Sequence, residues 1–416
     1  MSYLKVGTSL KIEALTHNWV EFNNKNNTTW MYIILISLGI ASTVTDWMIG
    51  IFSMSDFIFG FIIVCLMVSN NYRLTIKQIM WLFILLGTIS ANIWLNYYMN
   101  ELFVLKTGIA ALIKIAFYSF VLLGCYNLVK NKQQEEKFLK IINVIAIIVG
   151  IIGIYITLAI YLNGTLPYEF FWKFTRTDAT SYLYDGIENL YRTRSIFSEP
   201  SYLGYYLNIV LGINYFNKCN IQINKYINLF ITLVIILTFS YSSIAVMLII
   251  QSLHFFTKTN IRKIRFNWFY LMCLVAIIVL ISLFWDIIQV SIIDRTMSIL
   301  DGTDYSTRGR LLESWQYINR EHIFMGNGVG HTPSIWNIYA YILSDLGLIA
   351  FILFCLLTAY VLLSNVKLGL LLVCLNFQKG GYLSPEFWIF LLLIFIFIGE
   401  GYFEKRKSKR TLLKKV

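Results

Sequence analysis

Long apolar segments alternate with short polar ones along almost the whole chain. A helix that crosses a membrane needs about 20 mostly apolar residues, and by this measure the pattern predicts about twelve spans. We therefore expect an all-α fold, a polytopic transmembrane helix bundle that forms a single integral membrane domain over residues 1–416. The expected spans lie near residues 30–49, 53–70, 78–96, 103–128, 141–162, 200–217, 226–239, 242–257, 267–286, 337–363, 365–378 and 386–403.

Two stretches leave the number of spans open. Residues 226–257 and the residues after 364 each hold either two short spans or one long irregular span, so about ten or eleven spans is the alternative. The first apolar run begins only near Trp30, after a polar stretch, which indicates that the first span remains as an anchor. No internal repeat is visible, which counts against many transporter folds.

The composition agrees with a membrane protein. Of the 416 residues, 58% are hydrophobic and only 13% are charged, which excludes an ordinary soluble globular domain. The six cysteines and four histidines are scattered, without the spacing of metal ligands. The sequence thus predicts neither a metal site nor a cofactor.

Positive charge sets the expected orientation. With the N-terminus in the cytoplasm, most of the 34 Lys and Arg residues fall in inside segments, as the positive-inside rule requires. Both termini are then cytoplasmic, and two long periplasmic loops containing short helices cover residues 164–199 and 287–336. This distribution explains the net charge of +12 without a nucleic acid partner. The unequal loops place the expected chemistry on the outer face.

The first long loop ends in RTRSIFSEPSYLGYY, residues 192–206. A guanidinium group suits a phosphate, so Arg194 at the mouth of a membrane helix is a candidate for holding a diphosphate at the bilayer surface. The alternative is an arginine that reaches the lipid headgroups and pairs with Glu199. Glu199 precedes Pro200 and is either the N-cap of the following helix or a group that orients or deprotonates a sugar hydroxyl.

The second long loop contains DYSTRGRLLESWQYINREHIF, starting at residue 304. Ser306 or Thr307 can cap a helix that runs to about Arg320. Residues two apart lie on nearly opposite sides of a helix, so Arg308 and Arg310 can bind one anion only if the helix begins at or after Arg308. We expect such a first-turn arrangement, in which helix N-terminal amides and an arginine bind an anion together.

Two further segments carry polar residues. MGNGVGH predicts a flexible glycine loop and not a P-loop, because the G-K-S/T ending is absent; His331 after it is either a base or a loop residue bonded to its own backbone. LTFSYSSIAVML places Ser240 and Ser242 between two apolar half-segments, where they either line a pocket or form helix-to-helix hydrogen bonds. Lys114, deep in the fourth span, either neutralises a lipid phosphate or pairs within the bundle.

In order and spacing from about residue 190 to 350, RSIFSEPSYLG, LTFSYSS, STRGRLLESW, GNGVG and WNIYAYILSDLG resemble the O-antigen polymerase and ligase superfamily. Its members are integral membrane glycosyltransferases that act on undecaprenyl-diphosphate-linked sugars outside the membrane. The resemblance implies a metal-independent, arginine-rich site for the diphosphate at Arg194, Arg308 and Arg310. Where ligases carry a histidine before an asparagine, this chain has Trp336 before Asn337, which favours a polymerase.

The resulting hypothesis is a polysaccharide polymerase of a bacterial inner membrane that joins lipid-linked repeat units of O-antigen or a related surface polysaccharide, with inversion at the anomeric carbon. Its expected partners are the undecaprenyl-diphosphate-linked donor and acceptor, membrane lipid and a chain-length regulator protein. The alternatives are an O-antigen ligase, a transporter or flippase of lipid-linked oligosaccharide, and a scaffold of an export complex. We assign catalysis to Arg194, Glu199, Arg308 and His331, and substrate binding to Arg310, Ser240, Ser242, Trp315, Asn337 and Lys114.

Overall fold

The computed structural model describes residues 28–162, 165–175, 183–184, 190–258, 282, 285, 289–379 and 381–399, and these residues are mostly helical. A short antiparallel ribbon pairs β1 (Met48–Ile49) with β2 (Phe52–Ser53). Two 3-10 helices, η1 (Glu169–Trp172) and η5 (Glu313–Tyr317), and one π-helix, η4 (Gln289–Asp294), lie in connections. The α-helices are Thr28–Ala41, α2 (Met54–Val68), α3 (Ile76–Met99), α4 (Leu105–Asn131), α5 (Glu135–Tyr161), α6 (Pro200–Phe216), α7 (Lys225–Leu237), α8 (Tyr241–Lys258), α11 (Arg295–Leu300), α12 (Tyr305–Leu311), α13 (Ile338–Ser364), α14 (Val366–Gln378) and α15 (Pro385–Phe397).

Every predicted span that falls within the described residues overlaps one of these helices, but the helix in the predicted span 30–49 ends at Ala41 and Met48–Ile49 form β1. The predicted span 267–286 lies almost wholly outside the described residues. Within the described part of the chain, α3, α4, α5 and α13 are long and apolar enough to cross a membrane. The other apolar helices are shorter. The count of about twelve spans stays a prediction.

The outer surface of α3 shows why water is a poor solvent for this bundle. Met80, Trp81 and Phe83 are 60%, 68% and 73% exposed. A helix that exposes large apolar side chains in this way needs another apolar phase around it, because such a patch in water favours aggregation. The surface of α3 is therefore suited to contact with lipid.

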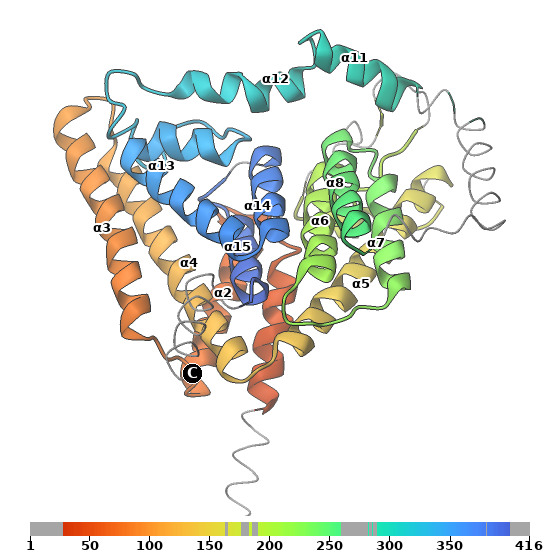
Figure 1. Ribbon diagram of the computed structural model, residues 1–416, viewed down its shortest axis with the longest axis horizontal. Helices are drawn as coiled ribbons and strands as arrows, with labels where there is room; N and C mark the ends of the chain where they lie inside the picture. The colour runs from red at the N-terminus through yellow and green to blue at the C-terminus, as the bar shows by residue number, and fades with distance from the viewer. Residues whose placement is uncertain are drawn as a thin grey trace, which may run out of the picture.

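Figure 1 shows how the helices are arranged. α3, α4 and α13 lie on one side and α6, α7 and α8 on the other, while α14 and α15 lie between them; α15 contacts both α4 and α6. We call residues 289–317, which contain α11 and α12, the strap, because these two helices lie across one end of the bundle (Figure 1).

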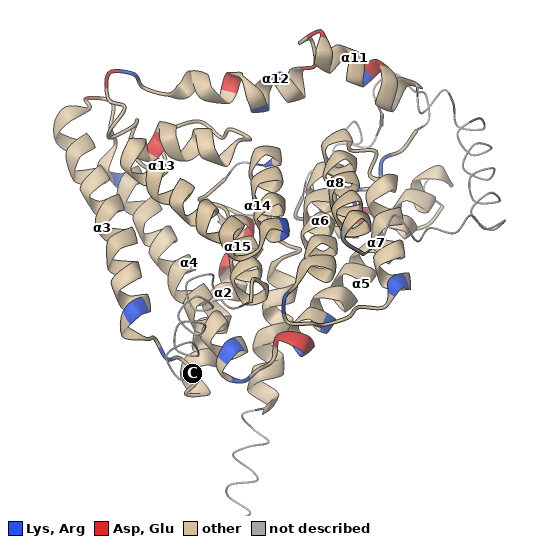
Figure 2. Ribbon diagram, in the orientation of Figure 1, with Lys and Arg blue, Asp and Glu red and all other residues tan. Residues whose placement is uncertain are grey.

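The connections between helices gather at two ends. Hydrogen bonds join Asn365 to the Phe216 carbonyl and Lys218 to the Phe397 carbonyl at the end away from the strap, which we call the basal end. Figure 2 shows both colours at each end, with blue prevailing around the basal end, where the first turn of α5 is red. Within the described residues, the strap end contains the connections 42–53, 100–104, 165–175, 183–184, 190–199, 238–240, 289–337, 379 and 381–384, and the basal end contains 69–75, 132–134, 217–224 and 365.

Asparagine side chains join the helices across the interior. Asn214 of α6 donates to Asn143 of α5 and to Asn228 of α7, both at 2.7 Å. All three side chains are at least 94% buried. Amide pairs of this kind hold helices together where lipid offers no hydrogen-bond partner.

α13 is not a continuous helix, although the sequence predicted one uninterrupted span there. Gly347 has φ 76° and ψ −173°, and the Leu348 N–H bonds to the Ile323 carbonyl at 2.9 Å. A Cβ on Gly347 would come within 2.3 Å of the Phe324 carbonyl oxygen. Only glycine fits both the backbone angle and the close approach, so the preceding loop folds against the break in α13.

Candidate functional site

The start of α6 brings an acid and a tyrosine close to an arginine from the strap. Glu199 occupies the N-cap position and Pro200 the first helical position, as predicted. The Glu199 carboxylate makes no cap hydrogen bond and accepts one from Ser201 Oγ at 3.2 Å, so capping does not account for it. Glu199 and Tyr202 both interact electrostatically with Arg310 of α12.

The helix that carries Arg310 begins earlier than predicted. Asp304 is its N-cap in place of Ser306 or Thr307, because the Asp304 carboxylate accepts a hydrogen bond from the Thr307 N–H at 2.6 Å. A carboxylate there satisfies a free N–H group and favours the positive end of the helix dipole. The helix ends at Leu311 instead of near Arg320.

The first-turn arrangement predicted for Arg308 and Arg310 is therefore wrong, because both arginines lie in the last turn of α12. The Arg308 side chain is 56% exposed and its Nε pairs with Glu313 at 3.0 Å. Arg310 is half-buried, and its pKa is lowered by burial and then by the charge of Arg295, against the attraction of nearby carboxylates. Arg310 interacts electrostatically with Glu199, whereas Arg308 pairs with Glu313.

Gly309 and Asn337 explain this orientation of α12. A Cβ on Gly309 would lie 2.7 Å from the Trp336 ring, so the glycine lets that side of the helix pack closely. Asn337 caps α13 by accepting hydrogen bonds from two N–H groups of its first turn, and its Nδ2 donates to the Arg310 carbonyl at 3.3 Å. Asn337, assigned to substrate binding, is completely buried and joins the two helices.

Arg194 lies inside the protein beneath the same helix end. It is 1% exposed, its guanidinium carbon lies 4.1 Å from the centre of the Trp172 ring, and its Nη1 donates to the Ser198 carbonyl at 2.7 Å. An arginine that reached the lipid headgroups would be exposed, so that alternative does not describe it. As placed, Arg194 positions the turn that leads to Glu199.

A second charged group, which the sequence analysis did not single out, lies beside Tyr202. Lys379, from the turn between α14 and α15, pairs with Glu386 of α15, and its Nζ lies 3.2 Å from the centre of the Tyr202 ring. Burial alone lowers the pKa of Lys379, but the charges of Glu386 and then Tyr202 outweigh it, so the pKa is raised. Asp46 also interacts with Lys379, and its Oδ2 accepts a hydrogen bond from the Ser198 N–H at 2.6 Å.

One signal could have pointed to these residues. Lys379 and Glu386 stand at the two ends of a turn between apolar segments, and Asp46 lies at the end of another. A charge at the mouth of a span was the reason for selecting Arg194, and the same criterion applies to all three. Their meeting with Tyr202 depends on tertiary structure alone.

His331 has no free ring nitrogen. Its Nε2 accepts a hydrogen bond from the Val104 N–H at 2.8 Å, so Nδ1 carries the proton and donates to the Val329 carbonyl at 3.0 Å. The ring also stacks on Phe103, with centres 4.4 Å apart. A base needs an available lone pair, so the loop alternative, bonded to backbone, describes His331, and the catalytic assignment has no support from this geometry.

The glycine loop before His331 is clamped, contrary to the predicted flexibility. Asp345, which is completely buried, accepts hydrogen bonds from the N–H groups of Gly330 and Thr332 at 2.8 and 2.6 Å and from the Tyr382 hydroxyl at 2.7 Å. Asn92 of α3 accepts another from the Val329 N–H at 3.2 Å. The loop N–H groups thus bond to buried side chains of α13 and α3, and Tyr382 holds Asp345 in place. These bonds restrain the loop.

The serine-rich break joins helices. Ser243 Oγ donates to Ser240 Oγ at 3.0 Å, and Gln378 of α14 donates to Ser242 Oγ at 3.3 Å and to Ser243 Oγ at 2.9 Å. A Cβ on Gly204 of α6 would overlap Ser243. Helix-to-helix bonding thus describes Ser242, whereas the Ser240 hydroxyl bonds within the break, and Gln378 links the break to the neighbouring Lys379.

The two remaining predicted residues lie in packing contacts. Lys114 of α4 lies 5.7 Å from the centre of the Tyr118 ring on the same helix, and Tyr118 donates to Asp56 at 2.6 Å. Trp315 in η5 is partly buried against the hydrophobic core. Neither residue has a contact that points to a ligand.

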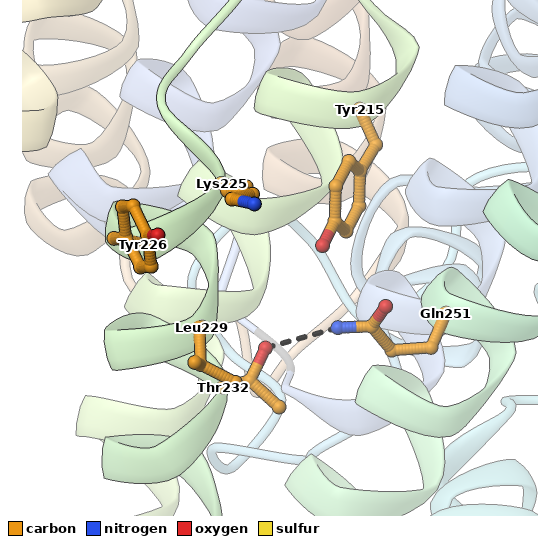
Figure 3. Close-up of a pocket in the computed structure, with 6 residues that line it drawn as sticks. All are labelled: Tyr215, Lys225, Tyr226, Leu229, Thr232 and Gln251. Carbon is orange, nitrogen blue, oxygen red and sulfur yellow. Dashed lines mark hydrogen bonds between the residues drawn. The ribbon is translucent and has the colours of Figure 1, made fainter. Parts of the chain in front are cut away.

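A surface hollow lies away from this charged group, at the opposite end of α6. Figure 3 shows its lining, in which Gln251 donates to Thr232 Oγ1 at 2.9 Å. Lys225 is the charged residue of the lining, and no carboxylate accompanies it. We place the candidate site at the strap end, because several acids and bases meet there. The hollow is lined by Tyr215, Lys225, Tyr226, Leu229, Thr232 and Gln251.

The strap end therefore offers cations and carboxylates. Across the described residues, His, Cys, Asp and Glu side chains form no group of three that could hold a metal ion. Arginine and lysine side chains next to carboxylates suit an anionic ligand and a proton transfer. Comparisons of the chain with protein-family models, curated proteins and solved structures give no match.

Proposed function

We propose that this chain is an integral membrane glycosyltransferase that polymerises undecaprenyl-diphosphate-linked oligosaccharide repeat units at its strap end. One observation carries the proposal: Arg310, from the second long loop, interacts electrostatically with Glu199, at the end of the first, and with Tyr202, in the first turn of α6. These residues lie in two of the segments on which the resemblance to O-antigen polymerases depends. Membrane interiors disfavour charge, so charged residues that come together near a membrane indicate a functional site.

The proposed reaction needs cations where the leaving group develops charge. When the anomeric C–O bond of the donor breaks, the electron pair goes to a diphosphate oxygen. Arg310, with Arg295 of α11 nearby, would stabilise this charge more in the transition state than in the substrate, and only that difference accelerates the reaction. Direct attack by the acceptor hydroxyl inverts the anomeric carbon.

Arg295 supports the same assignment. Its Nε lies 3.3 Å from Asp304, the residue that caps α12, and its guanidinium carbon lies 5.7 Å from the centre of the Tyr241 ring. Arg295 and Arg310 act on each other electrostatically. Two arginines held near each other suit a diphosphate, which carries charge on both phosphates.

The distribution of charge supports an outward strap end. The basal end carries Arg73, Lys77, Lys132, Lys140 and Lys225, and basic residues favour the cytoplasmic side. With this orientation the strap faces the periplasm of a bacterial inner membrane, where lipid-linked repeat units are joined by the enzymes that the chain resembles.

The experiment replaces the two strap arginines separately. In cells without another copy of the gene, R310A and R310K should shorten the polysaccharide ladder and lower the joining rate by about 10²–10³-fold, as expected for loss of one transition-state donor. Lysine should fail because it lacks the bidentate fork. R308A is the matched control, since Arg308 lies two residues away and is exposed.

Two outcomes would contradict the proposal. One is a normal ladder from R310A at wild-type protein level. The other is uptake of lipid-linked oligosaccharide into vesicles by the wild-type protein with no effect of any strap substitution on chain length, which would favour a transporter.

A further inference from the structure

Asp46 has one engaged and one unengaged carboxylate oxygen. Oδ2 accepts the Ser198 N–H at 2.6 Å. Oδ1 is buried, and no described residue donates a hydrogen bond to it. Buried acceptors normally have donors, so an exception calls for an explanation such as a catalytic role. Asp46 as a whole is partly exposed and lies at the strap end.

Asp46 lies among charged groups. Electrostatic interactions join it to Lys379, Glu386 and Tyr202. Lys379 pairs with Glu386 and lies against the Tyr202 ring. Lys379 supplies positive charge beside the two acids, Asp46 and Glu386. This charge offsets the repulsion between the two carboxylates.

Ser198 connects Asp46 to the arginine side of the site. Its N–H bonds to Asp46 and its carbonyl accepts from Arg194 at 2.7 Å. The next residue, Glu199, interacts with Arg310. Tyr202 interacts electrostatically with Arg310 and also with Lys379 and Asp46. The site thus has two parts, one with Arg310 and Arg295 and one with Asp46 and Lys379.

These two parts match the demands of an inverting transfer. The acceptor hydroxyl must approach the anomeric carbon from the face opposite the departing diphosphate, so a base belongs on the other side of the sugar from the arginines. Glu199 faces Arg310, on the diphosphate side. Both ring nitrogens of His331 are already bonded to backbone.

We propose that Asp46 is the base that receives the proton of the acceptor sugar hydroxyl, an inference that rests on the proposed function. The acceptor oxygen forms a bond to the anomeric carbon while the bond from that carbon to the diphosphate oxygen breaks. The bonding pair leaves with the diphosphate, and the hydroxyl proton moves to Asp46 Oδ1. The Ser198 N–H keeps the carboxylate oriented throughout.

The test compares D46N with D46E. Asparagine keeps an oxygen for the Ser198 N–H but is not a base. D46N should lower the joining rate by about 10²–10⁴-fold, the usual range for a general base, while purified protein binds undecaprenyl diphosphate within about twofold of wild type. D46E should recover part of the rate. D56N is the control: Asp56 lies at the same end, and its oxygens already accept from Ser53 N–H and Tyr118 OH.

The outcomes separate this inference from the proposed function. If R310A abolishes polymerisation and D46N does not slow it, the base assignment is wrong and the polymerase proposal stands. If both variants polymerise normally, the proposed function itself fails. If D46N loses binding of undecaprenyl diphosphate together with activity, Asp46 serves the donor site or the fold, and its role as base is rejected.

Discussion

At the scale of single residues, charged side chains in this protein are buried against aromatic rings. Arg194 lies on Trp172, and Lys379 lies on Tyr202. Cation–π contact of this kind strengthens when water is excluded. It lets a cation remain charged inside the bundle, but it does not replace a counterion, because the ring carries no net charge. Lys379 therefore still depends on Glu386.

Replacing Glu386 should separate stability from activity. E386Q leaves Lys379 buried with a neutral partner, and breaking a buried pair costs about 3–5 kcal/mol. The double variant K379M/E386M removes both charges and should recover most of the lost thermal stability. We expect the double variant to remain inactive, because it also removes the positive charge of Lys379 beside Asp46. Melting temperature in detergent and ladder length would be measured together; an active double variant would show that the pair is only structural.

The same scale shows where prediction from sequence stopped. Arg308 and Arg310 of the strap were recognised and Arg295 was not, and which arginine lies near Glu199 depends on where α12 begins. The predicted caps, Ser306 and Thr307, lie two and three residues after the actual cap, Asp304, and each residue of shift turns the helix by about 100°. Local sequence does not decide between caps of similar strength. The tertiary contact of Asn337 with α12 selects the outcome.

At the scale of elements, the strap depends on its first cap. Asp304 bonds to the Thr307 N–H and pairs with Arg295. Partial burial raises the pKa of Asp304, but the hydrogen bonds from Thr307 and then the charges of Arg295 and Arg310 lower it overall. A carboxyl with a depressed pKa contributes stability above its ordinary range, and this contribution is lost as pH falls through the lowered value.

D304A and D304N should therefore behave differently. Alanine removes the cap and the charge, and loss of an N-cap costs about 0.5–2 kcal/mol. Asparagine is also a good cap, so D304N loses only the charge. We expect D304A to speed proteolysis between residues 295 and 312 and to shorten the ladder, with D304N between D304A and wild type at neutral pH, because it keeps the cap and loses the charge. Equal protection of the two variants would show that the cap does not hold the strap.

At the scale of the whole molecule, the helices were predictable and the site was not. Each span is encoded by a continuous apolar run, so its position follows from local sequence. The candidate site is built from three distant parts of the chain, around Asp46, Glu199 and Lys379, together with the strap. No local pattern specifies that these parts meet. Successive helices run in opposite directions, so their connections lie in turn at the strap end and at the basal end, and these parts all lie at the strap end.

This alternation leads to the last prediction, which concerns orientation. Leu102 and Tyr305 at the strap end are 87% and 70% exposed, and Lys132 at the basal end is also exposed. In spheroplasts, a membrane-impermeant maleimide should label L102C and Y305C at once and K132C only after permeabilisation, because basic connections stay in the cytoplasm. The parent protein, with its native cysteines, gives the background labelling. Labelling of K132C alone in intact spheroplasts would place Arg310 and Asp46 in the cytoplasm, where no lipid-linked polysaccharide is polymerised in the proposed reaction.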